Sequence, residues 1–309
     1  MWAEPDEPEV VERMRTAHRQ AVSALGVLLD QDVPGAWGWR GRTLSRPVIA
    51  PGGPGWLRVA CAPAGHIVRT FWDGSLDAEQ AIPASVPRPK LRASHDWSHD
   101  QWEYRAELYD RVAAHPVATS ATLRTVPDLP ATWWAALRTA LEEIATVPTC
   151  RFTVCPQYLD GVMPRFLGTP IETTVPCWST AHGDLHYANL CAPILRLLDW
   201  EGWGLAPRGY DAAVLHSHSL LLPRLAARVR SEFAPLFDTP TGRFAELVAI
   251  TQTLHSTTRG NNLDLAEPLR NRAALLLGRP VPSLSQRGPD RNGRQVQSQK
   301  GAFREGCHR

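Results

Sequence analysis

Two acidic side chains and one amide lie close together in sequence in the second half of the chain, and their spacing constrains the fold more than any other feature. The segment His182–Asn189 reads His-Gly-Asp-Leu-His-Tyr-Ala-Asn, and Leu-Asp-Trp-Glu follows at Leu198–Glu201. The apolar run Ile194–Leu198 predicts a short buried strand that ends at Asp199. A loop, a strand and a carboxylate are therefore expected to form one local unit.

The residue types at these positions suit the transfer of a phosphoryl group. Magnesium takes hard oxygen ligands and keeps several waters, so Asn189 and Asp199 are the candidate metal ligands. A carboxylate held away from the metal can orient an acceptor hydroxyl and take its proton, and Asp184 is the candidate for that base. The interval from Asp184 to Asn189 equals that of the kinase catalytic loop.

At these residues the sequence resembles the aminoglycoside phosphotransferase and choline kinase-like branch of the protein kinase-like superfamily. Residues 182–190 match its catalytic loop, residues 197–201 its metal-binding segment, and residues 207–213 the segment that follows, although the usual acidic residue before that segment is absent. The resemblance implies that Asp211 is structural, either accepting hydrogen bonds from backbone amides of the catalytic loop or capping a helix. His182 is likewise expected to hold backbone.

The resemblance implies an α+β, two-lobed protein kinase-like fold, with a small β-rich N-terminal lobe and a larger, mostly helical C-terminal lobe. It implies an ATP-dependent phosphotransferase with an alcohol group as acceptor, and Mg²⁺ and ATP as cofactors. The partners would be ATP and a small hydroxyl compound such as an amino sugar or amino alcohol. The sequence leaves open the acceptor, the choice of ATP or GTP, a role in resistance or metabolism, and the oligomeric state.

The amino-terminal half is expected to hold the nucleotide. Residues 56–60 alternate as a strand, and residues 76–82 read as a helix. The resemblance assigns Arg58 and Glu79 to the ion pair that clamps the nucleotide phosphates, with Arg69 as a rival for the basic position. A solvent-facing position on an edge strand is an equal alternative for both arginines.

The nucleotide-binding loop and the hinge are less sharply marked. Gly35, Gly38 and Gly41 lie where a phosphate-binding loop is expected, but their spacing matches no recognised fingerprint, and an ordinary turn is the alternative. The strand pattern of residues 104–112 is expected to lead into a hinge at residues 112–116, which in the family receives the adenine.

Three parts are expected along the chain. Residues 1–112 form a nucleotide-binding lobe with a leading helix, residues 113–278 a catalytic and acceptor-binding lobe, and residues 279–309 a disordered tail. The tail holds seven Lys or Arg against two acids, which gives it a charge of +5 and leaves −3 for the rest of the chain. Its composition cannot bury enough surface to order it, and without stacking aromatics beyond Phe303 no nucleic-acid binding is expected.

Apolar residues at helical spacing predict most of the remaining structure. Helices are expected at residues 10–28, 130–147, 215–222, 225–237, 241–259 and 263–277. In the family the C-terminal helices build the acceptor pocket. The charged candidates facing it are Asp160, Glu201, Asp238 and Glu246, with a solvated surface carboxylate as the alternative for each.

The sequence also indicates where in the cell the protein is located. No apolar run in the 309 residues approaches the length of a membrane span, and the acidic amino terminus lacks a basic start and a cleavage site, so a cytoplasmic protein without a membrane partner is expected. The six cysteines have no metal-type spacing and are expected to be reduced thiols.

Two other functions compete with the kinase interpretation. A non-catalytic, nucleotide-binding pseudokinase is suggested by the unclear glycine loop and by Arg58 in the place of the usual lysine, because a planar guanidinium has a different reach from an ammonium. A metallophosphoesterase is suggested by Gly183–His186, which fits one fragment of that signature, although the other fragments are missing.

Overall fold

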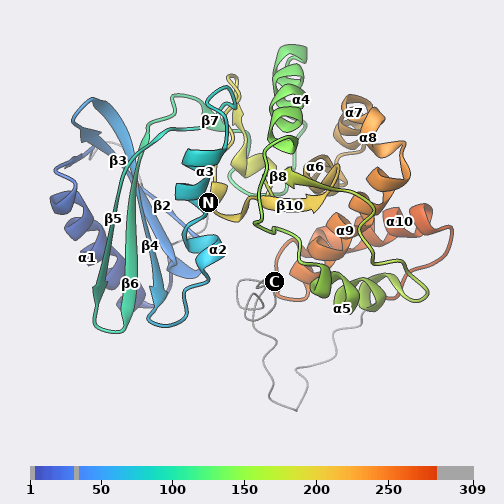
Figure 1. Ribbon diagram of the computed structural model, residues 1–309, viewed down its shortest axis with the longest axis horizontal. Helices are drawn as coiled ribbons and strands as arrows, with labels where there is room; N and C mark the ends of the chain where they lie inside the picture. Colours follow the sequence, from blue (N-terminus) through green and yellow to red (C-terminus); the bar gives the residue numbers. More distant parts are fainter. Residues whose placement is uncertain (1–3, 31–34, 284–309) are drawn as a thin grey trace. The chain divides into compact units, whose positions relative to one another are not determined.

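The structure, a computed structural model, describes residues 4–30 and 35–283, and the chain divides into two compact units (Figure 1). The first unit contains the described parts of residues 1–80 and residues 88–113. The second contains residues 81–87 and the described residues from 114 onward. Residues 284–309, which make up most of the predicted tail, lie outside the described residues.

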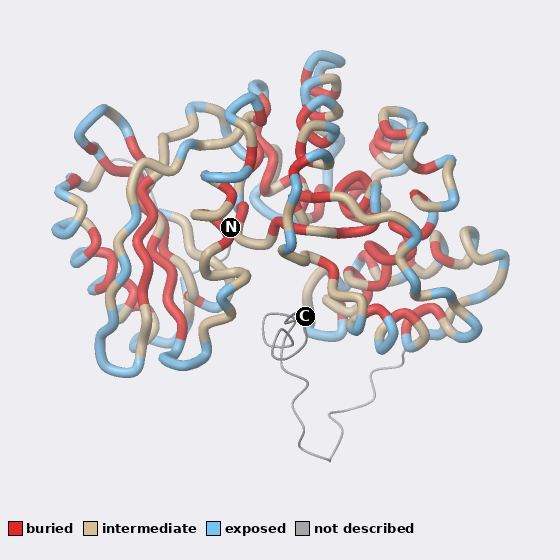
Figure 2. Tube along the Cα trace, viewed as in Figure 1, coloured by how far each residue is buried: buried red, intermediate tan, exposed pale blue. Residues whose placement is uncertain are grey.

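The first unit is built on one antiparallel sheet with the strand order β1-β3-β4-β6-β5, and β2 pairs with β3. The strands expected at residues 56–60 and 104–112 are confirmed as the two central strands, β4 and β6. Figure 2 shows that buried residues run along both. The strands are β1 (Leu28–Leu29), β2 (Ala36–Trp37), β3 (Thr43–Ala50), β4 (Gly53–Pro63), β5 (Leu91–His99) and β6 (Trp102–Asp110).

Helix α1 (Pro8–Ala24) packs on this sheet and contributes to the first core. Its apolar side chains recur every three or four residues, so Met14, Ala17 and Ala21 lie on one buried face. They form a cluster with buried residues of β4 such as Leu57 and Val59. The leading helix is thereby confirmed, although it ends at Ala24 and not near Leu28.

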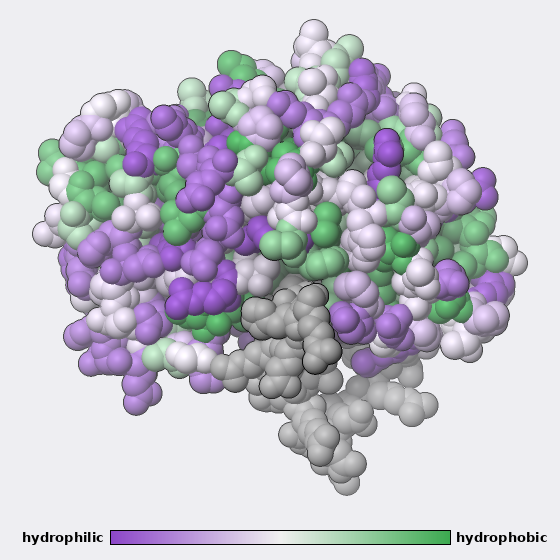
Figure 3. Space-filling view, in the orientation of Figure 1, coloured by the Kyte–Doolittle hydropathy of each residue, from purple (hydrophilic) through white to green (hydrophobic). Residues whose placement is uncertain are grey.

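Strand β5 lies at the edge of the sheet and has a polar outer face. Ser94, Asp96 and Ser98 alternate along it as exposed residues, as expected for an edge strand that faces water. In Figure 3 hydrophilic residues cover much of the visible surface of the first unit. The face of β6 that is turned away from α1 is nevertheless buried at Arg105 and Glu107.

Two short helices, α2 (Arg69–Trp72) and α3 (Gly74–Ala81), connect β4 to β5. The helix expected at residues 76–82 is confirmed as α3. The edge-strand position considered for Arg69 is wrong, because Arg69 begins α2 and its carbonyl accepts a hydrogen bond from the amide of Asp73 at 2.9 Å.

The second unit is mostly helical and carries two small sheets. Strands β8 (Trp178–Ala181) and β10 (Gly204–Pro207) pair antiparallel, as do β7 (His115–Pro116) and β9 (Cys191–Ala192). The helices are α4 (Ala131–Ala145), α5 (Pro156–Leu167), α6 (Tyr210–Ser219), α7 (Pro223–Glu232), α8 (Ala234–Phe237), α9 (Pro240–Thr257) and α10 (Ala266–Leu277). Together with the first unit they confirm the expected α+β class, with a β-rich N-terminal part and a helical C-terminal part.

Helix α9 forms the centre of the second unit. Twelve of its eighteen residues are buried, and α5, α6, α8 and α10 all contact it. The helices expected at residues 130–147, 215–222, 225–237, 241–259 and 263–277 are found with shifted ends, the third as α7 and α8. Helix α5 was not predicted, because Pro156, Gly161 and Pro164 interrupt its helical pattern.

Two simpler expectations concern the described residues alone. None of the helices in residues 4–30 and 35–283 combines the length and the apolar character needed to cross a membrane. The cysteines in that part of the chain, at positions 61, 150, 155, 177 and 191, are free thiols.

Candidate active site

The predicted catalytic loop begins where β8 ends. Ala181 pairs with Gly204 of β10, and His182 follows directly. Gly183 has φ +89°, and a Cβ there would lie 2.3 Å from the Thr153 hydroxyl oxygen and 2.8 Å from the Gly202 carbonyl oxygen. Only glycine fits this left-handed, closely packed position. The loop is thus bent sharply just before Asp184.

The buried carboxylate of Asp211 fixes that bend. It accepts hydrogen bonds from the backbone amides of His182 at 2.7 Å and Gly183 at 2.9 Å. Of the two structural roles considered for Asp211, the structure therefore shows the first. Burial raises the pKa of Asp211 to about 6, while the two amide hydrogen bonds oppose that rise because they favour the charged form.

His182 connects the catalytic loop to the segment that carries Asp199. Its Nε2 lies 2.8 Å from the carbonyl oxygen of Leu198, and its Nδ1 lies 3.4 Å from the backbone amide of Asp184. A neutral ring that donates from Nε2 and accepts at Nδ1 satisfies both contacts. Burial lowers the pKa of His182 to about 4, which keeps the ring neutral near pH 7.

Asn189 and Asp184 lie next to each other within this frame. The Asn189 side-chain amide donates to the Asp184 carbonyl oxygen at 2.9 Å, and its nitrogen lies 3.4 Å from the Asp184 carboxylate. The Asn189 side chain is nearly buried, whereas the Asp184 side chain is about half exposed at 56%. Because the amide nitrogen donates to the loop itself, the amide oxygen is the atom that can bind a metal. The Asp184 carboxylate meets solvent.

Asp199 lies beside Asn189 in a strained backbone conformation. The amide of Leu198 donates to the Asn189 carbonyl oxygen at 2.8 Å, so the next residue, Asp199, follows from that contact. Asp199 has φ +63° and ψ +67°, the left-handed region, at the start of the 3₁₀ turn Trp200–Gly202. A strained non-glycine residue of this kind is most common at functional sites.

The strand expected at Ile194–Leu198 is wrong in extent. Leu190 and Leu197 form an isolated antiparallel bridge, and Ile194 is exposed. The amide of Cys191 donates to the Arg196 carbonyl oxygen at 3.0 Å, so residues 190–197 form a short hairpin whose turn takes up the start of the expected strand. Asp199 is still delivered beside Asn189 by this hairpin.

The donor set of the loop fits magnesium. Asn189 and Asp199 offer an amide oxygen and a carboxylate, which are hard ligands, and an octahedral ion would take its other ligands from phosphate and water. Among residues 4–30 and 35–283, no group of three or more His, Cys, Asp or Glu is placed to hold a metal ion. A site with one amide and one carboxylate does not need such a group.

In the first unit, Arg58 lies on β4 directly opposite Glu107 of β6. Its guanidinium is 2.9 Å from the Glu107 carboxylate, which is 1% exposed, and the Tyr109 hydroxyl donates to the same oxygen at 3.0 Å. An opposite-charge pair facing across antiparallel strands stabilises the sheet. Glu107 was not among the predicted residues, although the alternating pattern of residues 104–112 gave a hint of its register.

The predicted ion pair between Arg58 and Glu79 is wrong. Glu79 on α3 instead pairs with Arg88, and its carboxylate also accepts the amide of Leu91 at 3.0 Å. Since Leu91 is the first residue of β5 and Arg88 lies just before it, this carboxylate fastens the helix to the sheet. Arg58 keeps its place on a central strand.

Packing accounts for the last of the three candidate glycines, Gly41. Residues Trp39–Gly41 form a 3₁₀ turn between β2 and β3. Gly41 has φ +68°, and a Cβ there would lie 2.6 Å from Val10 and 2.7 Å from Pro5. Glycine is therefore required at this position by α1 and the segment before it.

Comparison with solved structures defines the fold. The chain matches the crystal structure of aminoglycoside phosphotransferase APH(4)-Ia with a TM-score of 0.58 and 14% identity, over 85% of this chain and 98% of that chain. The fold is that of the aminoglycoside phosphotransferases. A thermostable mutant of that enzyme in a ternary complex with ADP and hygromycin B matches with a TM-score of 0.57, at the same identity and coverage. No protein-family model and no curated protein matches the sequence.

The hinge expected in the aminoglycoside phosphotransferase fold coincides with the division between the two units. Strand β6 ends at Asp110, and Arg111 pairs with Asp30 at 2.7 Å inside the first unit. The division falls between Ala113 and Ala114, within the predicted hinge of residues 112–116.

The four carboxylates expected to face the acceptor have different surroundings. Glu246 of α9 is fully buried and pairs with Arg272 at 2.7 Å, so its candidacy is wrong. Exposed Asp238 lies 3.4 Å from Arg230, and exposed Asp160 accepts from the Thr173 hydroxyl at 2.5 Å. Glu201 lies two residues after Asp199 in the 3₁₀ turn.

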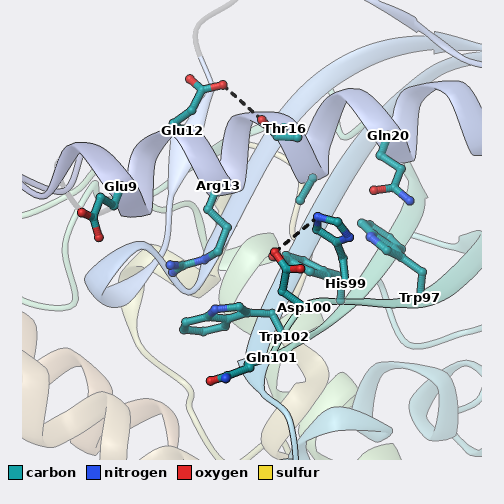
Figure 4. A pocket seen from close by; sticks show the side chains of 12 residues that line it. Glu9, Glu12, Arg13, Thr16, Gln20, Trp97, His99, Asp100, Gln101 and Trp102 are labelled. Carbon is teal, nitrogen blue, oxygen red and sulfur yellow. Dashed lines mark hydrogen bonds and ion pairs between the residues drawn. The ribbon is translucent and has the colours of Figure 1, made fainter.

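A cavity of about 1000 Å³ lies in the first unit between α1 and the β5–β6 hairpin (Figure 4). The Arg13 guanidinium lies 3.7 Å from the centre of the Trp102 ring, and Trp97 stacks on Tyr104. None of the predicted site residues lines this cavity.

Proposed function

We propose that this chain is a kinase that transfers the γ-phosphoryl group of ATP to a hydroxyl group of a small molecule. The observation that carries the proposal is one hydrogen-bonded frame. Asp211 and His182 hold the backbone of the loop, the loop presents Asp184 to solvent beside Asn189, and His182 also bonds to the carbonyl of Leu198, the residue before Asp199. A base and two oxygen ligands on one rigid loop are what positioned phosphoryl transfer requires.

Each residue has a defined task in this proposal. The Asp184 carboxylate accepts a hydrogen bond from the acceptor hydroxyl and takes its proton as that oxygen bonds to the γ-phosphorus and the bond to the β-phosphate oxygen breaks. Asn189 and Asp199 would hold Mg²⁺, which when bound offsets phosphate charge. The left-handed backbone of Asp199 follows directly on the hydrogen bond between the Leu198 amide and the Asn189 carbonyl oxygen, which supports a role beside Asn189.

The first unit would hold the nucleotide. Arg58 is the favoured phosphate contact because it lies on a central strand, where Glu107 and Tyr109 fix its orientation. Arg69 lies outside the sheet, at the start of the four-residue helix α2. The adenine would lie against the backbone of residues 112–116.

Two features of the solved structures support the proposal. The APH(4)-Ia complexes contain ADP or AMP-PNP together with hygromycin B. The mutants in those two complexes replace an aspartate and an asparagine, respectively, separated by the same interval as Asp184 and Asn189.

The test is ADP release from Mg²⁺ and ATP over a broad panel of hydroxyl acceptors. We expect turnover to fall by roughly 10²–10⁴-fold in Asp184→Asn, since a positioned base contributes that much. Asp128→Asn changes an exposed aspartate before α4 in the same way and serves as the matched control. Equal activity in both variants would reject the proposed base.

A non-catalytic nucleotide-binding protein is the second candidate. The observation that favours it is that Glu79 pairs with Arg88, so the expected ion pair between Glu79 and Arg58 is not formed. Stabilisation of the chain by ATP, with no ADP release for any acceptor, would support this alternative. Release of phosphate from phosphoesters without nucleotide would instead support a phosphoesterase.

A further inference from the structure

A line of polar side chains runs along α9 from the catalytic loop. Gln252 and His255 are three residues apart and so lie on one side of the helix, and Arg259 follows in the turn after its last residue. The hydroxyl of Tyr210 donates to the side-chain oxygen of Gln252. Tyr210 precedes Asp211, whose carboxylate binds the loop, so this line starts next to the catalytic frame.

Helix α5 contributes a second set of side chains to the same place. The Tyr158 hydroxyl lies 2.7 Å from Nδ1 of His255, and the two rings stack with centroids 5.7 Å apart. Phe166 packs on His255 at 5.6 Å, and the Arg165 guanidinium lies 5.6 Å from the Phe166 ring centre. Tyr158 and Arg165 are seven residues apart, nearly two helical turns, so they share one side of α5.

The hydrogen bond from Tyr210 to Gln252 connects this contact between α5 and α9 to the residue before Asp211. Burial raises the pKa of the Tyr210 hydroxyl well above its ordinary value, and the negative charges of Asp184 and Asp211 and the nearby Tyr158 raise it further. Tyr210 therefore lies within electrostatic reach of both the candidate base and the first residue of the α5 set. We call Tyr158, Gln252 and His255, with Arg165 and Arg259, the α5–α9 face.

The charges on the α5–α9 face are positive. Burial, and then the guanidinium groups of Arg259 and Arg165, lower the pKa of His255 to about 4, so its ring is neutral near pH 7. Asp160 is about 200° around α5 from Tyr158, on the opposite side. Glu246 lies within the core, where Arg272 neutralises it.

We propose that the acceptor of this kinase carries an anionic group, a carboxylate or a phosphate, which Arg165 and Arg259 bind while the reacting hydroxyl lies at Asp184. From Gln252 to Thr257, its last residue, α9 advances about 8 Å, and Arg259 lies two residues further along the chain. The acceptor is therefore a hydroxylated acid whose charged group lies away from the reacting hydroxyl. This inference rests on the proposed function and names its substrate class.

The experiment compares acceptors that differ only in charge. Lactobionate, lactitol and 1-amino-1-deoxylactitol share one hydroxylated scaffold and carry an acid, no charge and an amine. We expect kcat/KM for the acid to exceed that for the other two by about tenfold, the value of one charge-assisted hydrogen bond. Equal values, an advantage for the amine, or turnover of none of the three would overturn the inference.

Variants of the two arginines test whether these side chains cause the preference for the acid. Arg165→Gln and Arg259→Gln should each raise KM for the acid about tenfold, with a smaller change in kcat. Arg243→Gln, an exposed arginine near the start of α9, is the matched control and should change neither. Thermal stabilisation by lactobionate should be lost in the same two variants, a readout that needs no turnover. Unchanged KM and unchanged stabilisation would reject the assignment.

The two proposals fail separately. ATP hydrolysis in the absence of acceptor, dependent on Mg²⁺ and on Asp184, reports the kinase function alone. If this hydrolysis is present and the amine is preferred, only the acceptor class is wrong. If it is absent, the kinase function is wrong, and lactobionate stabilisation of the variants still decides whether the face binds an anion.

Discussion

The ring of His182 donates a hydrogen bond from Nε2 to the carbonyl oxygen of Leu198 over 2.8 Å. This bond joins two segments that carry different parts of the candidate site, because Asp184 follows the histidine and Asp199 follows the leucine. The backbone segments of the candidate base and of a candidate metal ligand are therefore joined by a side chain that is proposed for neither task.

Replacing this ring should separate the two segments. His182→Phe keeps the ring volume but leaves the buried Leu198 carbonyl without its donor, and we expect a loss of about 1–3 kcal/mol in the free energy of unfolding. KM for Mg²⁺ should rise as well, since Asp199 is no longer held beside Asn189. Urea unfolding and metal titration of ADP release measure the two effects. His182→Gln keeps a donor and should retain most of the stability and most of the Mg²⁺ affinity. Equal stability and equal KM for Mg²⁺ in the two variants would disprove the role of this hydrogen bond.

Asp211 should make stability depend on pH. Its pKa is about 6 in the folded chain against an ordinary 3.8, so the folded state binds the proton more tightly. The stabilisation is then fully present below about pH 4 and is lost as the pH rises through 6. Urea unfolding between pH 4 and 7 gives the free energy of unfolding of the wild type and of Asp211→Asn. Relative to the variant, the wild type should become more stable as the pH falls. A difference that moves the other way would mean that the two amide bonds outweigh burial.

Asp199 should trade stability for function. Glycine adopts φ +63° without strain, whereas alanine does not, so Asp199→Gly should be more stable than Asp199→Ala by roughly 1 kcal/mol. Both variants lack the carboxylate and should lose Mg²⁺-dependent turnover. Thermal unfolding compares the pair, and equal melting temperatures would show that the backbone at this position is not strained.

Glu246 should be essential for folding and not for chemistry. It is fully buried, and although burial raises its pKa, hydrogen bonds from His216 at 2.9 Å and Arg272 at 2.7 Å hold the pKa down to about 2. Removing one partner of such a buried pair costs about 3–5 kcal/mol, so Glu246→Gln should unfold at much lower urea concentration. The contribution is present above pH 4.5 and is lost as the pH falls through 2. Preserved stability in this variant would contradict the pairing.

The two candidate phosphate contacts can be ranked by substitution. Arg58→Gln should raise KM for ATP about tenfold, the effect of losing one charge-assisted contact, and Arg69→Gln should raise it less. Initial rates over a range of ATP concentrations, at saturating acceptor, give both values. A larger effect at Arg69 would move the phosphate contact from β4 to α2.

The sequence predicted the parts that depend on local spacing. The loop residues from His182 to Asn189, the backbone role of Asp211 and the strand around Arg58 follow from motif and alternation, and the structure contains each of them. The partner of Glu79 was wrong because two arginines, Arg58 and Arg88, compete for it, and only strand register decides between them. Register depends on long-range pairing that no local pattern contains.

The α5–α9 face was missed for a related reason. Tyr158 lies on a helix whose pattern Pro156, Gly161 and Pro164 interrupt, and His255 lies far away in sequence on α9. Nothing in either segment marks it as a neighbour of the other. Packing of the two helices alone brings them together.

The assignment of residues 81–87 to the second unit has a practical consequence for dissecting the gene. The Pro87 carbonyl accepts the amide of Leu197 at 2.8 Å, and the Ser85 hydroxyl donates to Glu143 of α4, so this segment belongs to the helical part although it interrupts the sheet-forming part in sequence. If the chain were divided once near residue 113, the first fragment would still contain residues 81–87. The second fragment would lack this segment of its own fold. Only a split gene that returns these seven residues to the second fragment could yield two independently stable proteins.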